Sequence, residues 1–135
     1  MMRPTLLDTD TLSYLVRREP IALQSAERYM VEQGALQLSI ISYYESLSGL
    51  LYKDAQQQMG RFQTLVGLHT VVPLSIESVN ISARIEADLR RNGLSIGATD
   101  TLIAGVALAN GLQLATNNTA HFSRIEGLQL VNWMQ

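Results

Sequence analysis

Five side chains with carboxylate or amide oxygens follow apolar runs of strand length or open a helical pattern: Asp8, Asp10, Glu45, Asp100 and Asn118. Carboxylates gathered at one place repel one another and raise their own pKa values unless a cation favours the ionised forms. Mg²⁺ and Mn²⁺ prefer oxygen ligands and keep water molecules that a substrate phosphate can replace. The acids therefore indicate divalent-cation chemistry on phosphates, provided that the fold brings them together.

The chain offers few alternatives to oxygen as a metal ligand. It contains no cysteine, which excludes disulfides, thiolate metal sites and cysteine nucleophiles. His69 and His121 are the only imidazoles. Of the ten basic residues all but Lys53 are arginines, so chemistry that depends on lysine has a single candidate.

Length and composition indicate one globular domain over residues 1–135. The chain has 135 residues, of which 47% are hydrophobic and 16% charged, enough for one sizeable core but too few for two ordinary domains. A net charge of −2 argues against a strongly basic surface that coats nucleic acid. No stretch reaches the roughly 20 apolar residues of a membrane span, and no signal peptide is apparent, so a cytoplasmic location without membrane contact is expected.

Strand-like runs alternate with helical patterns along the whole chain. Strands are expected at 5–7, 36–41, 71–72, 112–116 and 128–131, and helices at 12–19, 21–33, 76–91 and 99–110, with two more that begin at Ser42 and Asp54. Because parallel strands need crossover connections, this alternation predicts an α/β three-layer fold with a mostly parallel central sheet and helices on both faces. Ligands of such sheets bind beyond the carboxyl ends of the strands, where the five oxygen-bearing side chains are expected.

Each acid also has a purely structural explanation. Asp8, Asp10 and Asp100 are suited to cap helices, and Ser42 with Glu45 has the three-residue spacing of a capping box. Four independent caps need not converge on one edge of a sheet, however, and their coincidence there favours a functional cluster.

The polar residues near the fourth strand are expected to have structural rather than functional roles. The pair Asn117-Asn118 is typical of a turn. His121 follows that turn and lies next to Phe122, where a surface or packing histidine is expected more than a phosphate contact.

Four segments follow one another in a recognisable order: LLDTD at 6–10, IISYYE at 40–45, GATDTLIA at 97–104 and LATNNTAHF at 114–122. No single one is specific, but the ordered set resembles the PIN domain family, and within it the VapC-type toxins of bacterial type II toxin–antitoxin pairs. The resemblance covers nearly the whole chain and implies the three-layer PIN-like fold.

The resemblance also implies roles for individual residues. Asp8, Glu45 and Asp100 match the family's three acidic catalytic and metal-site residues, and Thr116 matches a small hydroxyl residue often found beside them. Asn118 stands where many members have a fourth aspartate. Asp10 stands where asparagine is common, which suggests that one carboxylate is moved in this chain rather than lost.

The activity that the resemblance implies is Mg²⁺- or Mn²⁺-dependent cleavage of RNA, with transfer RNA or ribosomal RNA as the substrate class. It further implies a homodimer and a hetero-oligomer with a VapB-type antitoxin, whose C-terminal segment lies across the active cleft. The sequence does not identify the RNA target, the antitoxin or the number of metal ions.

Two other functions fit parts of the sequence. Residues 6–11 also fit the hydrophobic strand and the Asp-x-Asp part of the motif of a haloacid-dehalogenase-like phosphohydrolase, with Asp8 as nucleophile and Asp10 as general acid. That class needs a late lysine and a second late acid, whereas Lys53 lies early and no acid follows Asp100 until Glu126. A catalytically weak PIN-fold binding module, its site weakened by Asn118, is the alternative without enzyme activity.

Overall fold

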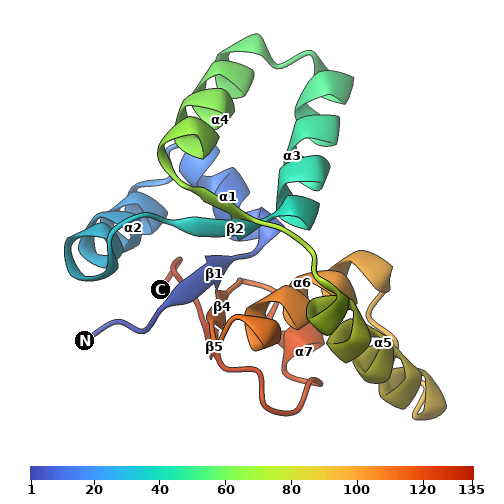
Figure 1. The fold of residues 1–135 in the computed structure, drawn as a ribbon. Helices are drawn as coiled ribbons and strands as arrows, with labels where there is room; N and C mark the ends of the chain where they lie inside the picture. Colours follow the sequence, from blue (N-terminus) through green and yellow to red (C-terminus); the bar gives the residue numbers. More distant parts are fainter.

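The computed structural model describes all 135 residues as an α/β fold. Its elements in chain order are β1 (Thr5–Leu7), α1 (Thr9–Val16), α2 (Pro20–Gln33), β2 (Gln37–Ser39), α3 (Ile40–Lys53), α4 (Gln56–Leu68), β3 (Thr70–Val72), α5 (Ile76–Arg91), α6 (Ala98–Ala109), β4 (Gln113–Ala115), α7 (Thr119–Phe122) and β5 (Leu130–Val131) (Figure 1).

The sheet has five strands in the order β3-β2-β1-β4-β5, and every neighbouring pair is parallel. The chain first builds outward from β1 to β2 and β3, then returns to the other side of β1 for β4 and β5. The gap between the carboxyl ends of β1 and β4 is therefore the topological switch point, where open α/β sheets bind their ligands.

Alternating side chains of the strands divide the core between the two faces of the sheet. Leu6 packs with residues of α5, α6 and α7, whereas its neighbour Leu7 packs with residues of α1 and α2. Leu38 of β2 joins the cluster that α1, α3 and α4 contribute. The predicted three-layer architecture with helices on both faces is confirmed, and the sheet is parallel throughout.

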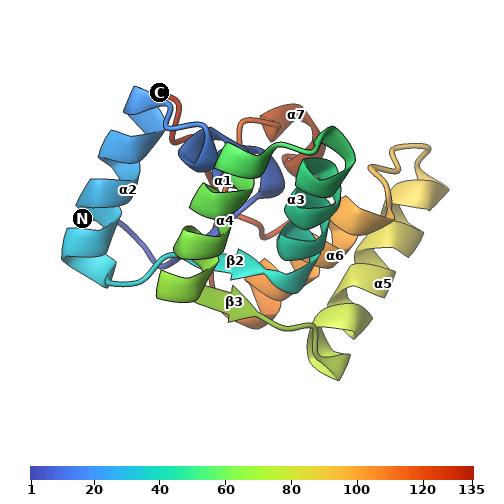
Figure 2. The ribbon, with the colours of Figure 1, turned by 90° about the horizontal axis from the view of Figure 1, so that it is seen from above.

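Helices α3 and α4 form an antiparallel pair that leads out from β2 and back to β3 (Figures 1 and 2). Phe62, fully buried, joins α4 to the core, and its ring contacts Tyr43 of α3 with 5.4 Å between centroids. The pair holds one side of the cleft in which Glu45 lies.

Two predicted boundaries around α3 are wrong. The second strand ends at Ser39, not Ile41, because the Ser39 hydroxyl accepts a hydrogen bond from the backbone N–H of Ser42 and caps the helix there. Ser42 and Glu45 therefore form no capping box. Asp54 does not begin α4; it ends α3 in the left-handed conformation, with φ of 52°.

The other strand and helix positions agree with the expectations to within a few residues, and Trp133 is buried at the edge of the core. No helix is both long and apolar enough to cross a membrane.

Candidate active site

Asp8 lies at the switch point, immediately after β1, and is almost completely buried. Its Oδ1 accepts a hydrogen bond from the backbone N–H of Thr9 at 2.7 Å, so it does cap α1 as one interpretation held. Its Oδ2 accepts from the hydroxyl of Thr116 at 2.8 Å. One carboxylate thus caps α1 and is also bonded to the residue that follows β4.

Thr116 follows β4 and is fully buried beside Asp8. In addition to donating to Asp8, its hydroxyl oxygen accepts from the backbone N–H of Asn118 at 2.9 Å. Thr116 thus lies next to the first acid and also shapes the turn that follows.

Asp10 lies in the first turn of α1 with both carboxylate oxygens in use. Oδ1 accepts from the backbone N–H of Thr11 at 2.7 Å, and Oδ2 from the backbone N–H of Asn117 at 3.1 Å. It therefore fastens the loop after β4 to α1 while its negative charge stays next to Asp8.

Glu45 lies in the second turn of α3, not in the first as expected from the sequence, because the helix starts at Ile40. Its Oε1 accepts from the hydroxyl of Thr9 at 2.6 Å, and the same hydroxyl lies 3.0 Å from Oγ of Ser42. Thr9 was not singled out from the sequence, although it sits between the two aspartates of the first motif.

Asp100 is the third residue of α6 and not its cap. The N-cap is Gly97, whose φ of 100° lies in the range that favours glycine. The carboxylate Oδ2 of Asp100 lies 3.4 Å from Nδ1 of His121, and that nitrogen lies 3.1 Å from Nδ2 of Asn118. His121, expected on the surface or in packing, is thus a member of the site.

The carboxylates act on one another electrostatically. Burial, together with the charges of Asp10 and Asp100, raises the pKa of Asp8 to about 7, although the hydrogen bonds from Thr116 and Thr9 oppose the rise. Burial also raises the pKa of Asp100, helped by the charges of Glu45 and Asp10 and opposed by His121. The four acids therefore form one electrostatic cluster.

This donor set fits a hard divalent cation that retains water. No three acidic or histidine side chains stand close enough together to hold a metal ion between them. Mg²⁺ is commonly bound by one or two carboxylates with water filling the remaining positions, so full enclosure is not required. A cation among these oxygens would favour the ionised forms that the cluster now disfavours.

Comparisons with known proteins agree with this geometry. The model of the PIN domain family matches residues 5–128. The chain is 27% identical over 129 residues to the tRNA(fMet)-specific endonuclease VapC of Shigella flexneri, which covers 95% of this chain and 96% of that protein.

Solved structures give the same result. VapBC2 from Rickettsia felis, bound to a DNA fragment from the promoter, superimposes with a TM-score of 0.86 at 25% identity over 97% of this chain and 99% of that one. DNA-bound VapBC from Salmonella typhimurium also gives 0.86, at 26% identity over 98% and 99%.

Proposed function

The chain belongs to the PIN domain family, and on that premise we propose that it is a divalent-metal-dependent endoribonuclease, the toxin of a type II toxin–antitoxin pair. The observation that carries the proposal is the cluster at the switch point of the sheet. Its four acids come from three helices and a strand end: Asp8, Asp10, Glu45 and Asp100. They nevertheless lie close enough together that the charges of neighbouring acids raise the pKa values of Asp8 and Asp100.

Asp8, Glu45 and Asp100 are the residues that would hold the metal ion, one or two of them directly and the rest through its water molecules, because no three of the acids stand close enough together to share one ion. When bound, a divalent cation lowers the pKa of water for attack on a phosphodiester and offsets the charge that develops on the phosphate oxygens. The protein contributes the orientation of the ligands. Thr116 and the backbone N–H of Thr9 fix the two oxygens of Asp8, and the Thr9 hydroxyl fixes Glu45.

Asp10 supplies the charge that Asn118 does not. Asn118 carries an amide, whereas Asp10 raises the pKa values of both Asp8 and Asp100 through its charge. Because its Oδ2 accepts from the backbone N–H of Asn117 and its charge raises the pKa values of Asp8 and Asp100, we assign it an electrostatic and loop-holding role.

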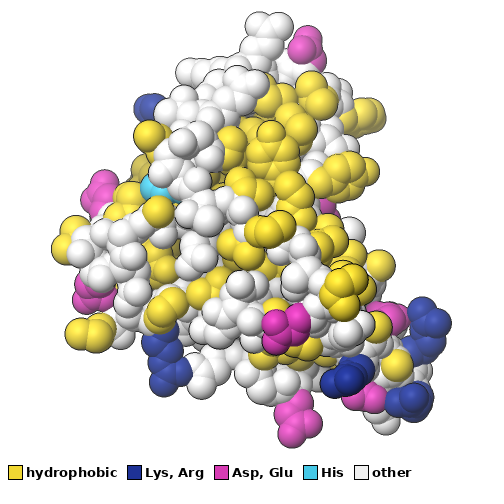
Figure 3. Space-filling view, in the orientation of Figure 1, with side chains coloured by type: hydrophobic (Ala, Val, Ile, Leu, Met, Phe, Trp, Pro, Cys, Tyr) yellow, Lys and Arg dark blue, Asp and Glu magenta, His cyan; other side chains and the backbone are white.

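An antitoxin and a second copy of the chain are the protein partners of this proposal, and the relatives named VapBC are themselves complexes. Several hydrophobic side chains of the α3–α4 pair are exposed, and Figure 3 shows hydrophobic side chains gathered over this part of the molecule. They are Ile40, Tyr44, Leu51, Tyr52 and Leu68. Exposed hydrophobic side chains gathered on one part of a molecule are typical of protein interfaces.

The substrate class is RNA, with transfer RNA favoured by the name of the Shigella flexneri relative, and the site of action is then the cytoplasm. The phosphohydrolase alternative loses support, since its required lysine is missing from the cluster. Lys53 lies eight residues beyond Glu45 on α3, about two helical turns away.

Expression in bacteria tests the proposal. Induction of the wild type should arrest growth and produce new RNA 5′ ends at defined positions, whereas Asp8→Asn, which keeps the size of the side chain, should do neither. If the folded wild type, like Asp8→Asn, neither arrests growth nor produces new RNA ends, the nuclease proposal fails and the binding-module alternative is favoured.

A further inference from the structure

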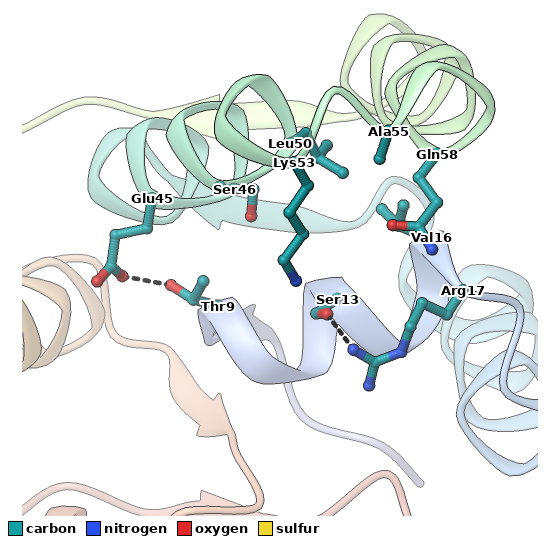
Figure 4. Close-up of a pocket in the computed structure, with 11 residues that line it drawn as sticks. Thr9, Ser13, Val16, Arg17, Glu45, Ser46, Leu50, Lys53, Ala55 and Gln58 are labelled. Atoms are coloured by element: carbon teal, nitrogen blue, oxygen red, sulfur yellow. Dashed lines mark hydrogen bonds between the residues drawn. The ribbon is translucent and has the colours of Figure 1, made fainter.

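A groove of about 350 Å³ runs away from the acidic cluster between α1, α3 and α4 (Figure 4). Glu45 and Thr9 lie at one end of it, joined by their hydrogen bond. Lys53 and Arg17 lie toward the other end, and both are exposed. The groove thus starts at the candidate active site and leads to two positive charges.

The two cations are available to a ligand. The salt bridges of the protein are Arg90–Glu86, Arg91–Asp88 and His121–Asp100, so neither Lys53 nor Arg17 is neutralised by an acid. Arg17 donates from one guanidinium nitrogen to Oγ of Ser13 at 2.9 Å, which orients the group and leaves its other donors free. Figure 4 shows the Lys53 side chain extending across the groove toward α1.

A polar group on the wall of the groove also lacks a partner. The hydroxyl oxygen of Ser46 is inaccessible to solvent and makes no hydrogen bond within the protein. Ser46 lies one residue after Glu45 and, like Ser13, lines the groove. Because solvent does not reach this oxygen, a ligand in the groove does not reach it either in this conformation, and Ser46 is part of the wall rather than a contact.

The acidic cluster and the two cations of the groove are far enough apart to contact different phosphates of one RNA strand. Glu45 and Lys53 are eight residues apart on a continuous helix, which places them about 12 Å from each other along the axis. A cation at that distance does not contact the phosphate that the acidic cluster handles. It lies where a phosphate further along the same backbone would pass, and the small volume favours a single strand over a duplex.

We propose that this groove binds the backbone of single-stranded RNA next to the cleavage position, with Lys53 and Arg17 contacting a phosphate further along the strand from the one that is cut. The inference rests on the proposed function, since it takes its substrate from there. It assigns a positioning role to the only lysine of the chain. Lysine and arginine contacts to phosphates release counterions, so their contribution is measurable as salt dependence.

The test measures binding of a short fluorescein-labelled single-stranded RNA by fluorescence anisotropy over a series of salt concentrations. The proteins carry Asp8→Asn so that the probe stays intact. Adding Lys53→Gln or Arg17→Gln should weaken binding about fivefold at low salt and reduce the slope of log K against log salt by about 0.7 for each lost contact. Lys53→Arg should keep the slope.

Arg84→Gln is the matched control, because Arg84 is also an exposed arginine without a salt bridge but lies on α5, outside the groove. An equal change of slope for the Lys53, Arg17 and Arg84 variants would overturn the inference. The inference would also be overturned if the Lys53→Gln and Arg17→Gln variants bound poly-glutamate, an acidic peptide, more weakly but bound RNA as well as before. The groove would then be a binding site for a protein partner.

Cleavage by the unmodified protein separates this inference from the proposed function. If RNA is cut in Mg²⁺ but the slope does not depend on Lys53, the groove assignment alone fails. If the slope depends on Lys53 but no RNA is cut in Mg²⁺ or Mn²⁺, the nuclease proposal fails and the groove remains an RNA-binding site.

Discussion

The hydroxyl of Thr116 donates a hydrogen bond of 2.8 Å to Oδ2 of Asp8, joining residues 108 positions apart in the sequence at the switch point of the sheet. Because the same hydroxyl accepts from the backbone N–H of Asn118, it fixes both the buried acid and the loop that leads to His121. Proper placement of Asp8 therefore depends on β1 and β4 pairing in register, as Leu7 and Ala115 do.

Thr116→Val should weaken metal binding while preserving the fold. Valine keeps the shape of threonine but removes the donor that stabilises the ionised form of Asp8, and loss of such an outer-shell partner typically lowers metal affinity by about 10- to 100-fold. Thr116→Ser retains the hydroxyl and is the control. Isothermal titration with Mn²⁺ measures the effect; equal affinity of the valine variant and the wild type would contradict the role assigned to this bond.

The stability of the metal-free protein should fall as the pH rises from about 4 to about 7. The pKa of Asp8 is raised from 3.8 to about 7 in the folded protein, so over this interval the unfolded chain loses a proton that the folded chain keeps. The stabilisation is complete below pH 3.8 and is lost as the pH passes 7, with a magnitude on the order of 4 kcal/mol at most.

The comparison must be made with Asp8→Asn, because His69 acts in the opposite direction. Its Nδ1 accepts from the backbone N–H of Leu36, and burial lowers its pKa, so His69 contributes stability at higher pH. In urea unfolding measured in EDTA, the free energy of unfolding should fall more steeply with rising pH for the wild type than for Asp8→Asn. Parallel curves for the two proteins would show that Asp8 titrates normally.

The order of strands and helices was predictable because each apolar run alternates with a helical pattern, and Asp8, Glu45 and Asp100 could be placed at one sheet edge by topology alone. The start of α3 was not predictable, because Ser39 and Ser42 are both suitable caps and only the end of β2 decides between them. Long-range partners such as Thr9 with Glu45 or His121 with Asp100 leave no local signal, since their contacts arise from tertiary packing.

Asp10→Asn should lower metal affinity and RNA cleavage together, by about tenfold. The amide removes the charge that compensates for Asn118, and its single oxygen can accept only one of the two backbone hydrogen bonds that Asp10 accepts. The double variant Asp10→Asn/Asn118→Asp should recover part of the affinity. Metal affinity and cleavage that do not change in Asp10→Asn would refute the idea that the carboxylate has moved.

Gly105→Ala should destabilise the packing of α5 against α6. An added Cβ at Gly105 would collide with Oγ of Ser82 and with the backbone oxygen of Ser78, and the latter cannot turn away. We expect a loss of about 1–3 kcal/mol in urea unfolding. Gly60→Ala in α4, where a Cβ meets nothing within 4 Å, should instead be neutral or stabilising; equal effects at the two positions would contradict this packing.

Above all, the proposed function requires that Asp8, Glu45 and Asp100 hold, directly or through bound water, a divalent ion on which RNA cleavage depends. The most direct measurement is cleavage of total transfer RNA by the purified protein while Mg²⁺ or Mn²⁺ is titrated, with Asp8→Asn, Glu45→Gln and Asp100→Asn in parallel. We expect no cleavage in EDTA, saturable restoration by the metal, and loss of cleavage in all three folded variants. Metal-independent cleavage, or full activity in any of these variants, would contradict it.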